Sequence, residues 1–214
     1  YMNMCIKERL SKRELERQID SGYYERYMLS QNPQSLALET AKKATGNIFL
    51  DNYVLDFLDV PEPMSEHDLQ KSIIRNLKDF ILEIGKDFTF VGEEYRVQVG
   101  NHDFFIDLLF YHRGLSCLVA FELKIGEFKP EYVGQINLYL EALDREVKKE
   151  NENPSVGIIL CASKDDEVVE FALSRSLSPT MVAEYNLKLI DKKLLQKKLK
   201  EYIELAKLTE DENA

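Results

Sequence analysis

The 214-residue sequence predicts a mixed α/β domain in which helices cover the faces of one central sheet. Three observations lead to this prediction. A long helical pattern is followed by three strand-like runs, and helices and strands then alternate along the rest of the chain. With 44% apolar and 31% charged residues, the composition can supply a sizeable core and is typical of a folded chain.

The individual elements follow from the spacing of apolar residues and from the turn residues between them. Helical spacing predicts one helix from Ser65 to Gly85, and Pro130 opens another that runs to about Lys149. Further helices are expected at about 165–174 and from about 191. The expected strands are Tyr95–Val99, Phe104–Tyr111, Cys117–Ile125, Val156–Cys161 and Met181–Tyr185, with turns at 100–102 and 112–114 in the first three.

The chain divides near two prolines, Pro61 and Pro63, because the residue before a proline is kept out of the α region. We therefore expect a helical segment over residues 1–60, the remnant of an N-terminal domain, and a main domain over 65–208.

Within the first segment, Ser11 and Glu14 have the spacing of a capping box, which satisfies free backbone N–H groups at a helix start. Gly22 ends that helix. Two more helical stretches are expected, over 33–44 and 47–58.

Composition excludes several classes of protein. Twenty-eight Lys and Arg against 38 Asp and Glu give a net charge of −10, which argues against a wholly basic DNA-binding surface but leaves a local site open. No run of about 18 apolar residues predicts a membrane span, and no signal peptide is visible. The three cysteines are far apart, as in a reduced cytoplasmic protein, and there is no zinc-site or nucleotide-loop spacing.

Charged residues interrupt two of the expected strands. Asp107 lies within an apolar run, and Glu122 and Lys124 share one side of the next strand because side chains alternate. If the two strands pair so that facing positions sum to about 227, Asp107 lies near Ala120, diagonal to Glu122 and within its reach. Two carboxylates and an amine would then share one patch of the sheet.

Two interpretations of this patch remain open from the pattern alone. Burying unpaired charges costs several kcal/mol, so Glu122 and Lys124 could be a structural ion pair, with Asp107 at a solvent edge. Alternatively, the two carboxylates hold Mg²⁺, which prefers oxygen ligands, and Lys124 positions a water or offsets the charge of a phosphate.

A family resemblance favours the second interpretation. Asp107, then fourteen intervening residues, then Glu122-Leu123-Lys124 resembles the signature of the PD-(D/E)xK nucleases. Longer stretches resemble the YhcG-type nucleases of that superfamily over about residues 65–200: FVGEEYRV (90–97), FFIDLLFYHR (104–113), CLVAFELKIGEFKPEYVGQINLYL (117–140) and NPSVGIILC (153–161). Residues 11–30 resemble the end of that family's helical N-terminal domain.

The resemblance implies a restriction-endonuclease-like fold with an αβββαβ core and a metal-dependent nuclease, in which a metal-activated water hydrolyses DNA phosphodiester bonds. It assigns Asp107 and Glu122 as ligands of Mg²⁺ or Mn²⁺, with the Leu123 backbone carbonyl as a further ligand. Lys124 becomes the catalytic lysine. Gln135 joins the catalytic residues, because Gln135 and Tyr139 match a Q-x-x-x-Y pattern seen in some of these nucleases.

Other positions are candidates for supporting roles. The superfamily often supplies another acid from the first helix, for which Glu66 is the candidate, while Gln70 occupies the spot where relatives carry Glu. Lys129 precedes a helix start, where free N–H groups favour phosphate. The expected partner is nucleic acid, with DNA preferred over RNA and a homodimer left open; a nuclease-fold module that binds without cutting is the alternative.

Overall fold

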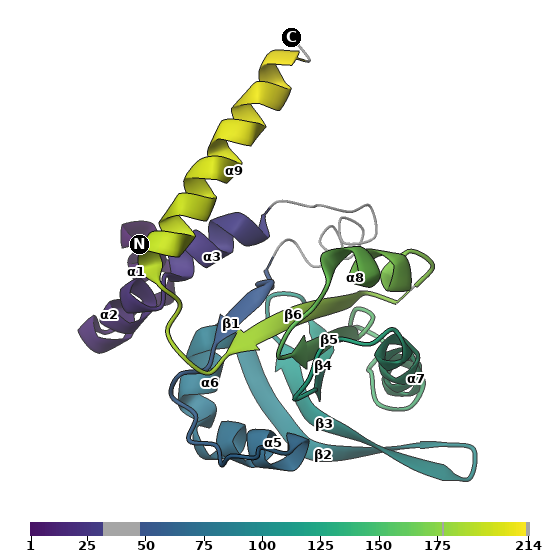
Figure 1. Ribbon diagram of the computed structural model, residues 1–214. Coiled ribbons are helices and arrows are strands. Elements are labelled where there is room, and N and C mark those ends of the chain that lie inside the picture. Colours follow the sequence, from purple (N-terminus) through teal and green to yellow (C-terminus); the bar gives the residue numbers. More distant parts are fainter. Residues whose placement is uncertain (32–47, 177, 213–214) are drawn as a thin grey trace.

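The computed structural model describes residues 1–31, 48–176 and 178–212, and the described strands form one six-stranded mixed sheet (Figure 1). The strands lie in the order β1-β6-β5-β4-β3-β2. β2, β3 and β4 form an antiparallel meander, whereas β4, β5, β6 and β1 pair in parallel. Their bounds are β1 Asn52–Val54, β2 Phe88–Val99, β3 His102–His112, β4 Cys117–Leu123, β5 Val156–Cys161 and β6 Thr180–Asn186. The predicted mixed α/β fold is confirmed.

Helices cover both faces of the sheet, each over its own apolar cluster. One cluster joins α5 and α6 to the sheet through Phe80, Phe110 and Phe121, and the other joins α7 and α8 to it. Helix α9 extends away from the sheet (Figure 1). The described helices are α1 Met2–Glu8, α2 Lys12–Asp20, α3 Tyr23–Ser30, α5 Glu66–Arg75, α6 Leu77–Ile84, α7 Glu131–Glu146, α8 Asp166–Leu173 and α9 Lys192–Glu212. None of them combines the length and apolar character that a membrane span requires.

Close packing places α7 directly on the central strands. A Cβ atom at Gly157 of β5 would lie 2.6 Å from the side chain of Ile136, so the helix can approach this strand only because the residue is glycine. All residues of β4 and β5 are buried, as expected for strands covered on both faces. The position of α7 matters below, because this helix also borders the end of β4.

The helix expected from Ser65 to Gly85 is in fact two helices. The α5 helix ends at Arg75 and α6 begins at Leu77, with Asn76 between them at φ −111° and ψ 29°. The Asn76 amide donates to the carbonyl of Ser72 at 2.9 Å, which gives the last turn of α5 a local partner. The single helix was wrong because apolar spacing continues across a one-residue break.

In the first sixty residues, the Ser11–Glu14 capping box is confirmed, but the helix expected over 47–58 is wrong. Residues 52–54 instead form the short edge strand β1, which pairs in parallel with β6, and Tyr53 and Val54 are fully buried. Three extended residues can resemble a helical turn in sequence, and their pairing partner lies about 130 residues away. The helix expected over 33–44 lies outside the described residues.

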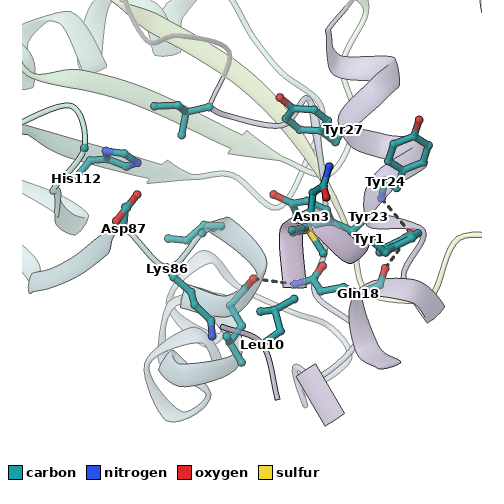
Figure 2. A pocket seen from close by; sticks show the side chains of 16 residues that line it. Tyr1, Asn3, Leu10, Gln18, Tyr23, Tyr24, Tyr27, Lys86, Asp87 and His112 are labelled. Carbon is teal, nitrogen blue, oxygen red and sulfur yellow. Dashed lines mark hydrogen bonds between the residues drawn. The ribbon is translucent and has the colours of Figure 1, made fainter. Parts of the chain in front are cut away.

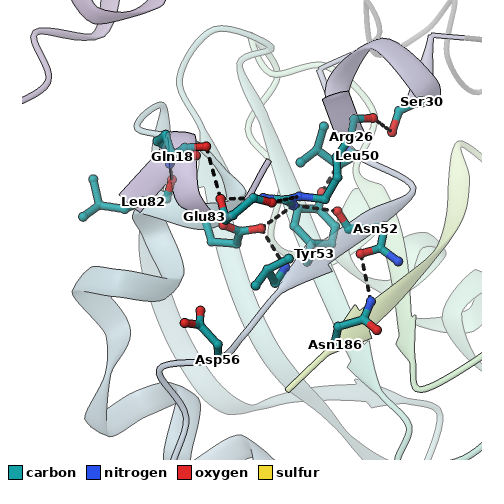
Figure 3. A network of polar contacts seen from close by, with 12 residues as sticks. Gln18, Arg26, Ser30, Leu50, Asn52, Tyr53, Asp56, Leu82, Glu83 and Asn186 are labelled. Carbon is teal, nitrogen blue, oxygen red and sulfur yellow. Dashed lines mark hydrogen bonds and ion pairs between the residues drawn. The ribbon is translucent and has the colours of Figure 1, made fainter. Parts of the chain in front are cut away.

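A buried ion pair ties the N-terminal helices to the sheet (Figure 3). Arg26 Nη1 of α3 lies 2.6 Å from Glu83 Oε1 of α6, and both side chains are almost completely buried. The same carboxylate oxygen accepts the N–H of Val54 at 2.7 Å, and Arg26 Nη1 also donates to the carbonyl of Asn52. Arg17 brings a second guanidinium to within 3.8 Å of Glu83. Helix α3, strand β1 and helix α6 therefore share one polar centre.

We expect Arg26→Met to lower the free energy of unfolding by about 3–5 kcal/mol, because the substitution leaves Glu83 buried without its closest counter-charge. Urea unfolding monitored by circular dichroism measures the change. The double variant Arg26→Met/Glu83→Gln should cost less than the sum of the two single changes. Additive losses would show that the pair is not energetically coupled.

A cavity of about 670 Å³ lies between the N-terminal helices and the end of α6 (Figure 2). Its lining includes a group of tyrosines on one side and Lys86, Asp87 and His112 on the other; the tyrosines are Tyr1, Tyr23, Tyr24 and Tyr27. His112 is 2% exposed, and its Nδ1 accepts the N–H of Leu115 at 3.0 Å. Burial lowers the pKa of His112, against the opposing charge of Asp87. The imidazole is therefore held neutral.

His112 should make the free energy of unfolding depend on pH. Because its folded pKa lies below the unfolded value of about 6.5, the unfolded chain binds the proton first, and stability falls as the pH drops below about 6.5. The slope can reach about 1.4 kcal/mol per pH unit. In His112→Asn, a neutral side chain that can still accept from Leu115, urea unfolding between pH 7 and 5 should show a shallower loss. Parallel curves for the two proteins would contradict this expectation.

Candidate active site

Charged side chains gather at the end of the central strand β4. Glu122 is 2% exposed and Lys124, immediately after the strand, is 8% exposed. Lys124 continues the sheet, since its N–H donates to the carbonyl of Leu160 on β5 at 2.9 Å. The parallel strand β5 therefore fixes the backbone that carries both groups.

The pairing of β3 with β4 brings Asp107 beside these residues. Leu108 faces Phe121, so facing positions sum to 229, and the next position along the ladder places Asp107 beside Glu122. The expected sum of about 227, with Asp107 near Ala120, was wrong. His112 pairs with Cys117, so the connecting loop is longer than the predicted turn, and its last residue, Ser116, has a left-handed backbone with φ 50°.

Two hydrogen bonds hold Asp107 in place. Its carboxylate oxygen Oδ2 accepts the backbone N–H of Leu123 at 2.7 Å, which links β3 to the last residue of β4. Gln70 of α5 donates its amide to the backbone carbonyl of Asp107 at 2.8 Å and is itself 5% exposed. Gln70 thus fixes the strand that carries the acid, and its side-chain nitrogen is directed at the backbone.

Lys124 lies between two carboxylates and an aromatic ring. Its ammonium nitrogen Nζ is 2.9 Å from Glu122 Oε1, 3.4 Å from Glu66 Oε2 and 5.0 Å from the centre of the Tyr132 ring. The ring of Tyr132, in the first turn of α7, adds a cation–π contact to the two ion pairs. Three elements, α5, β4 and α7, therefore hold this ammonium group.

The cluster is short of positive charge. Asp107, Glu122 and Glu66 carry −3 when ionised and Lys124 carries +1, so −3 + 1 gives −2. Burial, followed by the charge of Asp107, raises the pKa of Glu122 to about 7, and burial also raises the pKa of Asp107. Burial alone would lower the pKa of Lys124, but the hydrogen bond and charge of Glu122 outweigh it and raise that pKa. A divalent cation would neutralise this excess.

The donor atoms suit a hard cation such as Mg²⁺. Glu122 Oε2 is buried and has no hydrogen-bond partner, and Asp107 uses one carboxylate oxygen for the Leu123 N–H. No three His, Cys, Asp or Glu side chains within the described ranges converge as a metal cluster. Mg²⁺ binds through one or two carboxylates and keeps several waters, so the pair formed by Asp107 and Glu122 fits this ion. It does not fit an ion that requires three or four protein side chains.

Gln135 and Tyr139 form a pair on the neighbouring helix. The Gln135 amide donates to the Tyr139 hydroxyl at 2.7 Å, and Tyr139 is 4% exposed. Burial raises the pKa of Tyr139, and the negative charges of Glu122 and Asp107 add to the rise, so this hydroxyl lies within electrostatic range of the cluster. Lys129 is exposed and, within the part of the chain that the structure describes, makes no ion pair with the cluster.

Sequence reasoning missed two residues of the site. Tyr132 contacts Lys124 through its ring, and Glu94 of β2 adds its negative charge to the field at Asp107. Glu94 has a left-handed backbone with φ 42°, close to an irregularity in the pairing between Phe90 and Gly92. No sequence signal marks either residue. Tyr132 has the spacing of a core aromatic residue, and the alternation of side chains along a strand does not reveal the irregularity near Glu94.

The meander, the following helix and the parallel strand, with an acid on the second strand and Glu-x-Lys at the end of the third, define the PD-(D/E)xK class. Residues 46–200 match the family described as "YhcG PDDEXK nuclease domain". The chain is also 37% identical over 193 residues to "Putative nuclease YhcG" of Escherichia coli strain K12, covering 88% of this chain and 52% of that protein. The chain belongs to the YhcG PDDEXK nuclease domain family, and it spans about half the length of this relative.

Two solved structures share part of the fold. A repair endonuclease from Pyrococcus abyssi aligns with a TM-score of 0.39 and 17% identity over 59% of this chain and 48% of that chain. A complex described as EndoMS with double-stranded DNA aligns with a TM-score of 0.38 and 19% identity over 56% and 43%. These likenesses are partial, and the assignment to the family rests on the sequence matches alone.

A divalent cation should stabilise the wild-type chain through this cluster. We expect the melting temperature to rise as Mg²⁺ or Mn²⁺ is added, with a gain of about 2.7 kcal/mol at a free concentration 100 times the dissociation constant. Asp107→Asn and Glu122→Gln should lose the rise. Glu141→Gln, which alters an exposed acid on α7 paired with Arg145, should retain it. Equal shifts in all four proteins, measured by differential scanning calorimetry, would exclude the cluster as the binding site.

Proposed function

We propose that the chain is a Mg²⁺- or Mn²⁺-dependent nuclease that hydrolyses phosphodiester bonds of DNA. The observation that supports this most is the convergence of Asp107, Glu122 and Lys124, with Glu66 beside them, on one buried strand end where three carboxylates face a single ammonium group. A structural ion pair of Glu122 and Lys124 needs no second carboxylate beside it. The membership of the family favours the same chemistry.

The roles of the side chains follow from their positions. Asp107, Glu122 and the Leu123 carbonyl would hold the cation, which supplies a Lewis acid that polarises the phosphate and acidifies a bound water. Lys124 carries a positive charge that can approach a phosphate oxygen, where an ammonium about 4 Å away contributes roughly 4 kcal/mol at an effective dielectric constant near 20. Its contacts with Glu66 and Tyr132 hold it in position beside Glu122.

Residues around the cluster would orient the reacting groups. Gln70 fixes the backbone at Asp107, and the pair of Gln135 and Tyr139 supplies polar atoms from α7 within electrostatic range of the same cluster. Lys129, exposed just before α7, would contact a phosphate further along the nucleic-acid strand. We further propose a cytoplasmic protein of two units, a helical segment over 1–60 and a nuclease-like domain over 65–208, with a homodimer as the assembly that could reach both DNA strands.

The proposal predicts a loss of cleavage when the cluster is altered. With Mg²⁺ and plasmid or single-stranded DNA, Lys124→Met and Glu122→Gln should lower the rate by about 10²–10³-fold or more, the usual effect of removing one electrostatic group from a transition state. Lys164→Met is the matched control, since Lys164 follows the neighbouring strand β5, its side chain is about as buried, and it is paired with Asp166 and not with the cluster acids. Gel electrophoresis measures the products, with RNA of the same sequence as a parallel substrate.

Activity that persists in Glu122→Gln would contradict the assignment of this cluster as the active site. Cleavage of RNA alone would show that the substrate is RNA and not DNA, with the same mechanism. Complete absence of cleavage would support the second candidate, a nuclease-fold module that binds DNA or a protein partner. That candidate is favoured by Gln70, which brings no negative charge and donates to the backbone. Titration calorimetry with Mn²⁺ separates the two, because an inactive scaffold need not bind the ion.

A further inference from the structure

The three contacts that hold Lys124 differ in kind. Glu122 and Glu66 attract its ammonium group by charge, at 2.9 and 3.4 Å, whereas the ring of Tyr132 has its centre 5.0 Å from the nitrogen and is uncharged. An aromatic ring attracts a cation through the negative face of its π system. The ring contact therefore does not depend on the ionisation of any acid.

The two acids are weaker restraints when the proposed cation is considered. Glu122 would be a ligand of that cation, so its carboxylate would be shared between two positive charges that repel each other. The Glu66 side chain is 46% exposed, and an ion pair open to water holds its partners weakly. With a cation in the site, the hold of both acids on Lys124 would loosen. The attraction of the Tyr132 ring would remain.

The ring of Tyr132 is fixed by contacts that do not involve the acids. Phe128, four residues earlier, meets it edge to face, with ring centres 6.3 Å apart and an interplanar angle of 77°. Phe128 is 4% exposed and belongs to the apolar cluster that joins α7 and α8 to the sheet. Its N–H donates to the carbonyl of Ser163, just beyond β5, at 2.8 Å. The position of the ring is thus set by the core and by the neighbouring strand.

We propose that Tyr132 is a positioning residue for Lys124, and that its ring keeps the ammonium group beside Glu122 when a divalent cation occupies the cluster. This inference rests on the proposed function, because it concerns where Lys124 lies during cleavage. The ring face, and not the hydroxyl, is the part of Tyr132 that acts. Without the ring, the flexible lysine side chain would move toward solvent, and its charge would no longer be in place for a phosphate oxygen.

The first test observes Lys124 without relying on cleavage. The full chain is labelled with ¹³C at the ε carbon of lysine, because protons that lie over an aromatic ring resonate upfield of those of exposed lysines. Lys124→Met identifies the resonance by its loss. We expect the wild-type signal to lie upfield both in EDTA and in Mg²⁺. Tyr132→Leu, which keeps apolar bulk without a ring, should return the signal to the position of exposed lysines, and Tyr132→Phe should keep it upfield.

The second test separates positioning from folding. With Mg²⁺ and a DNA substrate, Tyr132→Leu should lower kcat by about 5- to 30-fold and leave KM unchanged, as the loss of a partly desolvated cation–π contact predicts. Tyr132→Phe should recover most of the rate. Tyr111→Leu is the matched control, because Tyr111 packs against the same apolar cluster but pairs with Leu118, at the other end of the β3–β4 ladder from Asp107. It should cleave at the wild-type rate.

Four results would overturn the proposal. The wild-type Lys124 signal could lack an upfield shift, or it could lose that shift when Mg²⁺ is added. Tyr132→Phe could be as slow as Tyr132→Leu, which would assign the role to the hydroxyl. An equal loss of kcat in Tyr111→Leu would show that the rate responds to packing in general.

The outcomes remain separate from those of the proposed function. An upfield Lys124 signal that Tyr132→Leu removes, in a chain that never cleaves DNA or RNA, would refute the nuclease and keep the ring contact. Cleavage with a kcat that does not respond to Tyr132→Leu would keep the nuclease and refute the positioning role.

Discussion

The central strand β4 imposes the constraint on which the rest of the site depends. It is buried on both faces from Cys117 to Leu123, yet it carries Glu122 and leads straight into Lys124. Charges in such a position are costly unless each has partners. The fold supplies contacts from three directions. Strand β3 brings Asp107, which accepts the Leu123 N–H, while α5 brings Glu66 and α7 brings the ring of Tyr132, both of which contact Lys124. The order of the elements therefore serves to enclose one strand end.

A comparison with another buried carboxylate, Glu83, shows what is unusual about Glu122. Glu83 lies between two guanidinium groups, Arg17 and Arg26, and accepts a backbone N–H as well. Glu122 shares a single ammonium with Glu66 and lies beside another acid, and its pKa rises to about 7. In the first arrangement, positive charge already balances the carboxylate, and the pair stabilises the fold. The second remains open to a cation, which is the property that distinguishes a candidate active site from a structural ion pair.

The sequence predicts those parts of the site that depend on local rules. Alternation along a strand is enough to place Glu122 and Lys124 together, and helical spacing is enough to pair Gln135 with Tyr139. Features set by distant contacts were not predictable. The register of β3 on β4 depends on a left-handed residue at Ser116, and strand β1 depends on pairing with β6 far along the chain. For the same reason nothing in the sequence marked Tyr132 as a neighbour of Lys124.

The net charge of −10 is compatible with a nucleic-acid substrate once distances are considered. At physiological ionic strength the Debye length is about 8 Å, so acids elsewhere on the surface are largely screened at the end of β4. The local field comes from Glu66, Asp107, Glu122 and Lys124, and a bound divalent cation would balance the charge of −2 that they carry when all are ionised. Overall charge then limits the affinity for a polyanion, because few phosphates are neutralised, but it does not decide the chemistry.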